Sequence, residues 1–224
     1  MVSREDPKKD PLARMVRPHL LRLAGYQPIR PVDAISEEEG RPASELLKLD
    51  GNENPYGCSP RVRQALAEYP WFHLYPDPEQ KRLRRALARY VGVGPEHIVA
   101  GAGSDEIIDL LLRLVLEPGD AVVNCPPTFG MYPFTTEVCG GRVVPAPRRP
   151  DFSLDVPAVK RALAGAKAIF IASPNNPTGA LTPQGEIQEL LESGALVVVD
   201  EAYQEFCGET VVPLASRHWN LVVL

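Results

Sequence analysis

Apolar runs and helix-spaced segments alternate along the chain from about residue 97. The runs that predict strands are His97–Ala100, Ala121–Asn124, Arg142–Pro145, Ala168–Ala172, Ala195–Asp200 and Leu221–Leu224. Between them, the spacing of apolar positions predicts helices over Ser104–Leu116, Phe129–Val138, Val156–Ala164 and Pro183–Glu192. The runs Ala168–Ala172 and Leu196–Val199 are apolar throughout, which is typical of strands covered on both faces. We therefore predict an α/β fold, with three α/β/α layers around a mainly parallel sheet.

The first part of the chain has a different pattern. Residues 1 to about 48 are polar, carry six prolines and include the acidic run Glu37–Glu39. Their one apolar patch, Leu12–Leu23, predicts at most a helix broken at Pro18. Helices are predicted next over Arg61–Tyr69 and Glu79–Tyr90. We expect residues 1–45 to be an N-terminal extension and residues 46–224 to belong to the α/β domain.

Composition excludes several classes of function. The 224 residues carry 24 Lys+Arg and 29 Asp+Glu, a net charge of −5, which argues against a basic nucleic-acid surface. No apolar stretch is long enough to span a membrane. The four cysteines are scattered, so we predict neither a metal site nor a disulfide framework, and we expect thiols in a reducing cytoplasm.

The glycine-rich segment after the first predicted strand is a candidate anion-binding site. Gly101–Glu106 follows a predicted strand and runs directly into a predicted helix. Glycine lets the backbone approach an anion, and Ser104 and the free amides of the helix start can donate to it. The third glycine of a dinucleotide fingerprint is replaced by Glu106, which weakens that interpretation. An ordinary turn is the alternative.

Two later strand ends carry ring and amide side chains. Phe129 follows Ala121–Asn124 and could stack on a planar ligand, although it and Tyr132 could equally anchor the core. The loop Ser173–Gly179 holds two asparagines between prolines, so it should be rigid, and Asn176–Pro177 is a candidate cis peptide bond.

The fourth strand end carries an acid and a phenol. Asp200 closes a fully apolar strand, and Tyr203 follows three residues later. A buried carboxylate is costly unless it is paired, and no arginine or lysine lies close in the sequence. Asp200 therefore needs a positive partner from elsewhere or from a ligand.

Six stretches carry a family resemblance. They are Leu49–Gly57, Tyr75–Pro78, Gly103–Glu106, Pro126–Tyr132, Ser173–Gly179 and Val199–Tyr203. In this order they resemble the histidinol-phosphate aminotransferase family, which belongs to the fold type I pyridoxal-phosphate (PLP) enzymes. The resemblance runs from about residue 46 to Leu224, and it implies that residues 46–224 are part of the large PLP-binding domain.

The resemblance implies roles at the cofactor. Gly103, Ser104 and Asp105, with the helix-start amides, would hold the phosphate, and Phe129 would stack on the pyridine ring. Asn176 and Tyr203 would bond the phenolic oxygen of the cofactor. Asp200 would pair with the pyridine nitrogen, which supplies the positive partner that its position requires.

The resemblance also implies partners. Tyr75 would reach the cofactor phosphate of a second subunit, which implies a homodimer, and Asn54 and Tyr56 would contact the substrate. The implied reaction moves an amino group between histidinol phosphate and 2-oxoglutarate, giving imidazole acetol phosphate and glutamate, in histidine synthesis. A threonine-phosphate decarboxylase, an aromatic amino-acid aminotransferase and an inactive fragment are the alternatives.

One residue that the implied reaction requires has no counterpart in this sequence. Transamination needs a lysine that forms a Schiff base with the cofactor and then carries a proton. The resemblance implies this lysine after the next strand, beyond Leu224, whereas the six lysines of the chain all precede Asp200. We therefore expect a C-terminally truncated chain with no catalytic lysine and with an exposed sheet edge that lowers its solubility.

Overall fold

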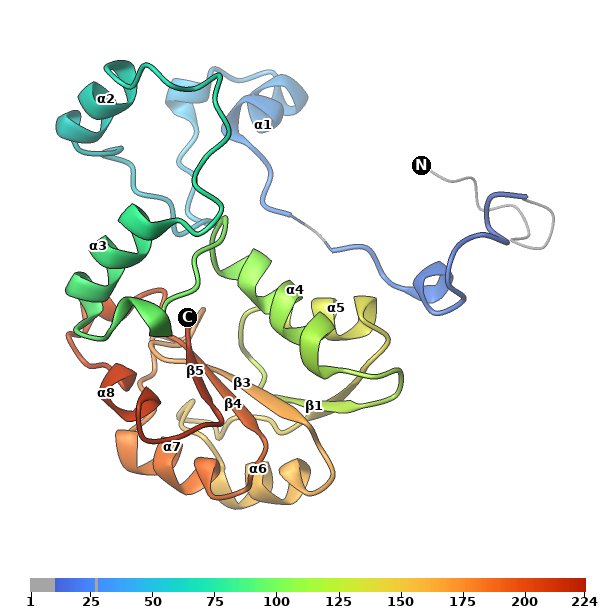
Figure 1. Ribbon diagram of the computed structural model, residues 1–224. Coiled ribbons are helices and arrows are strands. Elements are labelled where there is room, and N and C mark those ends of the chain that lie inside the picture. Colours follow the sequence, from blue (N-terminus) through green and yellow to red (C-terminus); the bar gives the residue numbers. More distant parts are fainter. Residues whose placement is uncertain (1–10, 27) are drawn as a thin grey trace. The chain divides into compact units, whose positions relative to one another are not determined.

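The computed structural model describes residues 11–26 and 28–224, which divide into two compact units (Figure 1). One unit is Glu79–Leu224 with the described residues up to Leu23, and the other is Ala24–Pro78. The first ten residues of the expected N-terminal extension lie outside the described residues.

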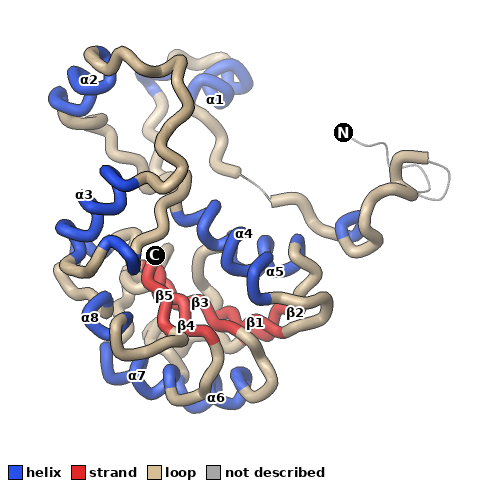
Figure 2. Tube along the Cα trace, in the orientation of Figure 1, coloured by secondary structure: helices blue, strands red, loops and turns tan. Residues whose placement is uncertain are grey.

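The larger unit is built on a five-stranded sheet (Figure 2). Its strands are β1 Ala121–Asn124, β2 Arg142–Pro145, β3 Ala168–Ala172, β4 Leu196–Asp200 and β5 Leu221–Val223. The order is β2-β1-β3-β4-β5, and every pair is parallel. Because β2 and β3 lie on opposite sides of β1, the strand order reverses there, and the carboxyl ends around this reversal are where α/β sheets bind ligands.

Helices cover both faces of the sheet (Figure 1). The helices of this unit are α3 Lys81–Val91, α4 Ser104–Val115, α5 Met131–Val138, α6 Val156–Leu163, α7 Gln184–Leu191 and α8 Val212–Ala215, with 3₁₀ turns at Leu20–Arg22, Pro95–His97 and Gln204–Phe206. Side chains alternate along a strand, so Val198 packs with α4 and α5, whereas Val197 and Val199 pack with α6, α7 and α8. The predicted three-layer parallel fold is confirmed.

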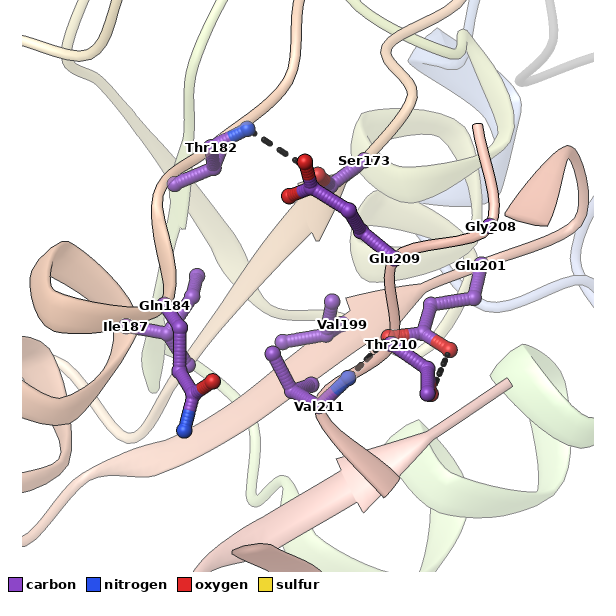
Figure 3. A pocket seen from close by; sticks show the side chains of 10 residues that line it. All are labelled: Ser173, Thr182, Gln184, Ile187, Val199, Glu201, Gly208, Glu209, Thr210 and Val211. Atoms are coloured by element: carbon purple, nitrogen blue, oxygen red, sulfur yellow. Dashed lines mark hydrogen bonds between the residues drawn. The ribbon is translucent and has the colours of Figure 1, made fainter. Parts of the chain in front are cut away.

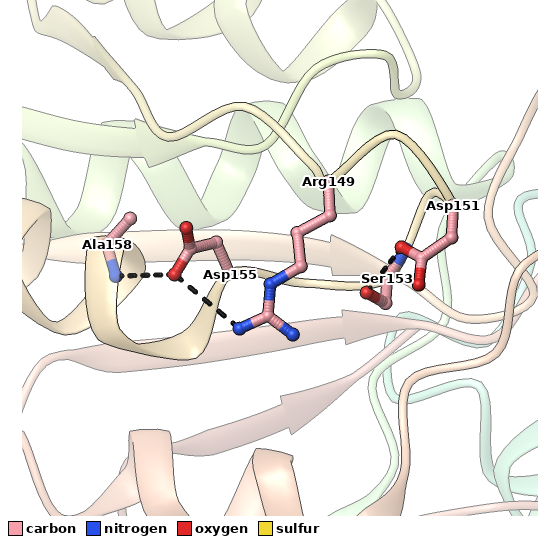
Figure 4. Close-up of polar contacts among 5 residues, drawn as sticks. All are labelled: Arg149, Asp151, Ser153, Asp155 and Ala158. Carbon is pink, nitrogen blue, oxygen red and sulfur yellow. Dashed lines mark hydrogen bonds and ion pairs between the residues drawn. The ribbon is translucent and has the colours of Figure 1, made fainter.

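Polar contacts define the loop between β2 and α6 (Figure 4). The Asp155 carboxylate accepts a hydrogen bond from the amide of Ala158 at 3.1 Å, which caps the start of α6. Arg149 lies 3.8 Å from the same carboxylate, and Asp151 accepts from the hydroxyl of Ser153 at 2.7 Å. This loop therefore leaves the sheet in a defined direction.

The segment before Leu23 meets the end of α5. The guanidinium of Arg17 donates to the carbonyl oxygen of Val138 at 3.1 Å, and a ring nitrogen of His19 lies 3.2 Å from the same oxygen. Val138 is the last residue of α5, where helix carbonyls lack intrahelical donors. These contacts therefore satisfy the helix end.

The Ala24–Pro78 unit contains α1 Val32–Glu39, a 3₁₀ turn at Ala43–Glu45 and α2 Pro60–Ala67. None of its described residues is buried. The helix α1 was not predicted, because its acidic sequence lacks a clear apolar stripe. The broken helix predicted over Leu12–Leu23 is present only as turns and the 3₁₀ turn Leu20–Arg22.

One predicted strand is wrong. His97–Ala100 contains the end of a 3₁₀ turn followed by extended residues that pair with none of the described strands. A short apolar run becomes a strand only beside a partner that bonds its backbone, and Val99 is exposed. The other five predicted strands are confirmed, each to within one residue at either end.

Candidate functional site

A cavity of about 260 Å³ lies at the carboxyl ends of β3 and β4. Its lining residues are Ala102, Gly103, Ser104, Asp105, Phe129, Tyr132, Ala172, Pro174, Asn176, Asp200, Ala202 and Tyr203. The segments after three separate strands meet there with the start of α4. The structure thus brings together Gly103, Ser104, Asp105, Phe129, Asn176, Asp200 and Tyr203, which the sequence singled out one by one.

The start of α4 lines the cavity. Gly103 is the N-cap residue with a left-handed φ of 85°, and it has no side chain to accept from the first amides of the helix. The amide of Ala102 donates to the carboxylate of Glu106 at 2.5 Å, so that donor is already used. The amides of the first turn and the Ser104 hydroxyl are therefore the groups here that can donate to an anion.

Asp105 adds negative charge to this helix start. Burial raises the pKa of its carboxyl group, and the charge of Asp200 raises it further. A carboxylate can only accept hydrogen bonds, so toward an anion Asp105 can contribute its backbone N–H and not its side chain.

The buried carboxylate of Asp200 also lines the cavity. Asp200 shares the sheet face of Val198, which places it on the α4 and α5 side, and its side chain is almost fully buried. Oδ2 accepts from the hydroxyl of Tyr132 at 2.6 Å, and Oδ1 accepts from the amide of Ala202 at 3.0 Å. Both donors are neutral, so the carboxylate charge is not cancelled by these partners.

Tyr132 is the site residue whose role was not recognised from the sequence, which left it as a possible core anchor. It is fully buried and stacks on Phe170, with ring centroids 4.9 Å apart and planes at 14°. Burial raises the pKa of its hydroxyl, and the charge of Asp200 adds to that shift. The one sequence signal was its spacing of three from Phe129 in the predicted helix Phe129–Val138, which would put both rings on one side, although α5 begins only at Met131.

The two adjacent asparagines have different surroundings. Asn175 is buried: its side-chain oxygen accepts from Thr128 at 2.9 Å, and its side-chain nitrogen donates to Pro127 and Thr178. It therefore ties the loop after β3 to the loop after β1, whereas Asn176 is half-buried and lines the cavity. The predicted cis bond between Asn176 and Pro177 is confirmed.

Aromatic rings form the side of the cavity. Phe129 is half-buried and meets Tyr132 edge-on, with centroids 5.5 Å apart and planes at 81°. Tyr203 is half-buried and packs against Phe206. A flat ligand in this space would meet ring surface.

Three predicted residues belong to the Ala24–Pro78 unit. Tyr75 and Tyr56 are exposed, and the Asn54 side chain both donates to the carbonyl of Gly57 and accepts from the amide of Tyr56, each at 3.0 Å. Asn54 thus organises its own turn. The roles of these three residues toward cofactor or substrate stay predictions.

A second cavity, of about 390 Å³, lies on the α7 side of β4 (Figure 3). Glu201 belongs to it because alternation turns Glu201 to the face opposite Asp200. The Glu201 carboxylate accepts from the hydroxyl of Thr210 and the amide of Val211, each at 2.6 Å, and burial raises the pKa of its carboxyl group. This cavity contains none of the predicted site residues, and no lysine or arginine is among the described residues that line it, so it does not suit a phosphate.

Among the described residues, no three His, Cys, Asp or Glu side chains are grouped so as to hold a metal ion. No helix in that part of the chain has the length and apolar character needed to cross a membrane.

A parallel α/β sheet that brings a helix start and a buried carboxylate together in one cavity at its strand ends is typical of cofactor-binding enzymes. The model of the family "Aminotransferase class I and II" matches residues 44–224, and the chain belongs to this family.

Its relatives include histidinol-phosphate aminotransferases. That of Roseiflexus castenholzii is 48% identical over 94% of this chain and 58% of its own length. The chloroplastic one of Nicotiana tabacum is 47% identical over 93% of this chain and 51% of its own length. The chain thus spans between half and three-fifths of these relatives.

Solved structures agree with this assignment. The histidinol-phosphate aminotransferase of Sinorhizobium meliloti, in complex with pyridoxal-5'-phosphate, superposes with a TM-score of 0.77 at 28% identity, over 93% of this chain and 57% of that one. The aspartate aminotransferase of Thermus thermophilus with maleate gives a TM-score of 0.76 at 25% identity, over 93% and 59% of the two chains.

Proposed function

We propose that the chain binds PLP in the cavity between α4 and Asp200, and that it serves the transfer of an amino group between histidinol phosphate and 2-oxoglutarate. The observation that carries the binding proposal is the cavity itself, which joins an anion-binding helix start to a buried carboxylate with neutral partners. The reaction is proposed from the relatives, whose names favour it over the decarboxylase and over the aromatic aminotransferase.

The donors and acceptors present fit this cofactor. The amides at Ser104 and Asp105 and the Ser104 hydroxyl would hold the phosphate, since they gather at a helix start whose N-cap has no side chain. The face of Phe129 would cover the pyridine ring. Asn176 and Tyr203, which line the same cavity, would bond the phenolic oxygen.

Asp200 would hold the proton on the pyridine nitrogen. When bound, the cofactor supplies an electron sink for the bond that breaks at the substrate carbon. The contribution of Asp200 is a fixed negative charge in a site with little water, where an opposite charge interacts more strongly than in bulk solvent.

None of the described residues that line the cavity is a lysine. We therefore expect these 224 residues to hold the cofactor without a covalent bond. The step that needs a lysine would then depend on a residue outside this sequence.

The dimer, the substrate contacts and the cellular location are proposed on grounds other than the cavity. We infer a homodimer in which Tyr75 contacts the cofactor phosphate of the second subunit, and the full exposure of its side chain supports this. Asn54 and Tyr56 are the proposed substrate contacts. We infer a cytoplasmic location, although the relatives include chloroplastic enzymes.

Titration with pyridoxamine phosphate tests the cofactor proposal. This form of the cofactor has an amine in place of the aldehyde, so it cannot label surface lysines. We expect wild type to bind it, and Asp200→Asn to weaken binding about 10- to 100-fold, because a hydrogen bond between charged groups contributes about 1.5–3 kcal/mol. Asp120→Asn is the matched control, since Asp120 pairs with Lys167 away from the cavity.

The outcome against the proposal is no binding by wild type, or equal binding by wild type and Asp200→Asn. With PLP itself, borohydride reduction followed by mass spectrometry should find no single preferred lysine. Complementation tests the substrate assignment: the gene with its flanking DNA is introduced into a histidine auxotroph, and growth without histidine is measured.

A further inference from the structure

We propose that Tyr132 is a positioning residue for the cofactor, whose hydroxyl donates to the Asp200 carboxylate and keeps it aimed at the pyridine nitrogen. This inference rests on the proposed PLP site. Its basis is the hydrogen bond of 2.6 Å from the Tyr132 hydroxyl to Oδ2 of Asp200, between residues 68 positions apart.

The contacts leave Asp200 able to accept further hydrogen bonds. Each carboxylate oxygen has two lone pairs, and each has one described donor, Tyr132 at Oδ2 and the Ala202 amide at Oδ1. Two fixed donors restrict rotation of the carboxylate, and Asp200 lines the cavity. The remaining lone pairs can therefore receive an N–H from a ring in that space.

Tyr132 is itself held in place. It is fully buried, it stacks on Phe170, and its carbonyl oxygen accepts from the hydroxyl of Thr136 at 2.8 Å. Burial and the charge of Asp200 both raise the pKa of its hydroxyl, so the phenol stays protonated at neutral pH. It is therefore a permanent donor to the carboxylate.

A neutral donor matters for the chemistry. An arginine or lysine beside Asp200 would neutralise its charge and would disfavour a second cation at the pyridine nitrogen. The buried Arg148 donates instead to the carbonyl oxygens of Phe152, at 3.1 Å, and Ala172, at 3.3 Å. A phenol stabilises the ionised carboxylate and leaves its charge available.

The test is ¹⁵N NMR of bound pyridoxamine phosphate labelled at the pyridine nitrogen. Loss of the phenol donor favours the state in which the proton lies on the carboxylate and the ring nitrogen is neutral. In Tyr132→Phe we therefore expect the ¹⁵N resonance at pH 7 to move toward the unprotonated position, with a dissociation constant about 3- to 10-fold higher. Tyr90→Phe is the matched control, because Tyr90 donates to Glu205 at 2.7 Å in the same kind of pair outside the cavity.

A second variant guards against a folding defect. Site-specific 3-fluorotyrosine at position 132 keeps the ring but is a stronger donor, so the ¹⁵N resonance should move the opposite way from that of Tyr132→Phe. A merely structural role would not give opposite shifts. Unchanged resonances in both variants would overturn the inference alone, whereas failure of wild type to bind the cofactor would overturn the inference together with the proposed function.

Discussion

The two units of the molecule differ in how they bury their apolar side chains. In the sheet unit, Ile169, Phe170 and Ile171 on β3 have no exposed surface, and helices cover both faces. In the Ala24–Pro78 unit no described residue is buried, and Trp71, Phe72 and Tyr75 are exposed. The sheet unit therefore has its own core, whereas the smaller unit exposes the kind of surface that usually meets a partner.

This difference extends to the proposed site. The cavity residues come from the unit with the core, so their positions follow from packing within it. Asn54, Tyr56 and Tyr75 come from the unit without buried residues. We expect substitutions in the first group to change folding or cofactor binding, and substitutions in the second group to change assembly or substrate binding.

The largest effect is expected in the sheet. Phe170→Ala removes a fully buried ring that stacks on Tyr132, and it should lower the free energy of unfolding by about 3–5 kcal/mol. Urea unfolding followed by circular dichroism measures this. A loss below about 1 kcal/mol would mean that the sheet is not the part that stabilises the chain.

The paired asparagines sharpen the comparison within the sheet unit. Asn175→Ala leaves the partners of three partly buried hydrogen bonds unsatisfied, so we expect a loss of about 2–3 kcal/mol in the free energy of unfolding. Asn176→Ala should change that free energy by less than about 0.5 kcal/mol and act on cofactor affinity instead. Denaturation and pyridoxamine phosphate titration of both variants separate the two roles, and equal stability losses would contradict them.

The fold was largely predictable because most of its strands are short apolar runs between clear helix patterns. The strand predicted over His97–Ala100 is wrong because a strand needs an adjacent strand to pair with, and the local sequence does not show one. At the site, Asp200 could be singled out as a buried carboxylate in need of a partner, yet its bond with Tyr132 joins residues 68 positions apart. Asn175 and Asn176 are chemically identical neighbours, and only the folded loop distinguishes the buried one from the one that lines the cavity.

The buried phenol predicts a smaller, pH-dependent effect. The pKa of Tyr132 is raised in the folded state, so its contribution to stability is present below the unfolded-state pKa of about 10 and is lost as pH rises above it. Above pH 10 wild type should lose up to about 1.4 kcal/mol per pH unit more than Tyr132→Phe, which has no hydroxyl to ionise. Urea unfolding of both proteins from pH 8 to 11 measures this, and parallel pH profiles would show that the hydroxyl is not buried beside Asp200.

The smallest effect is expected in the Ala24–Pro78 unit, and it is the sharpest test of the comparison. Trp71 is a large side chain with 53% of its surface exposed, so Trp71→Ala should change the free energy of unfolding by less than about 0.5 kcal/mol at low protein concentration. If this unit contacts a second copy of the chain, the variant should weaken self-association in analytical ultracentrifugation, because aromatic side chains contribute strongly at interfaces. Arg61→Ala, also exposed and in the same unit, is the control. A loss comparable to that of Phe170→Ala in dilute solution would mean that Trp71 belongs to a core, and the distinction between the two units would then fail.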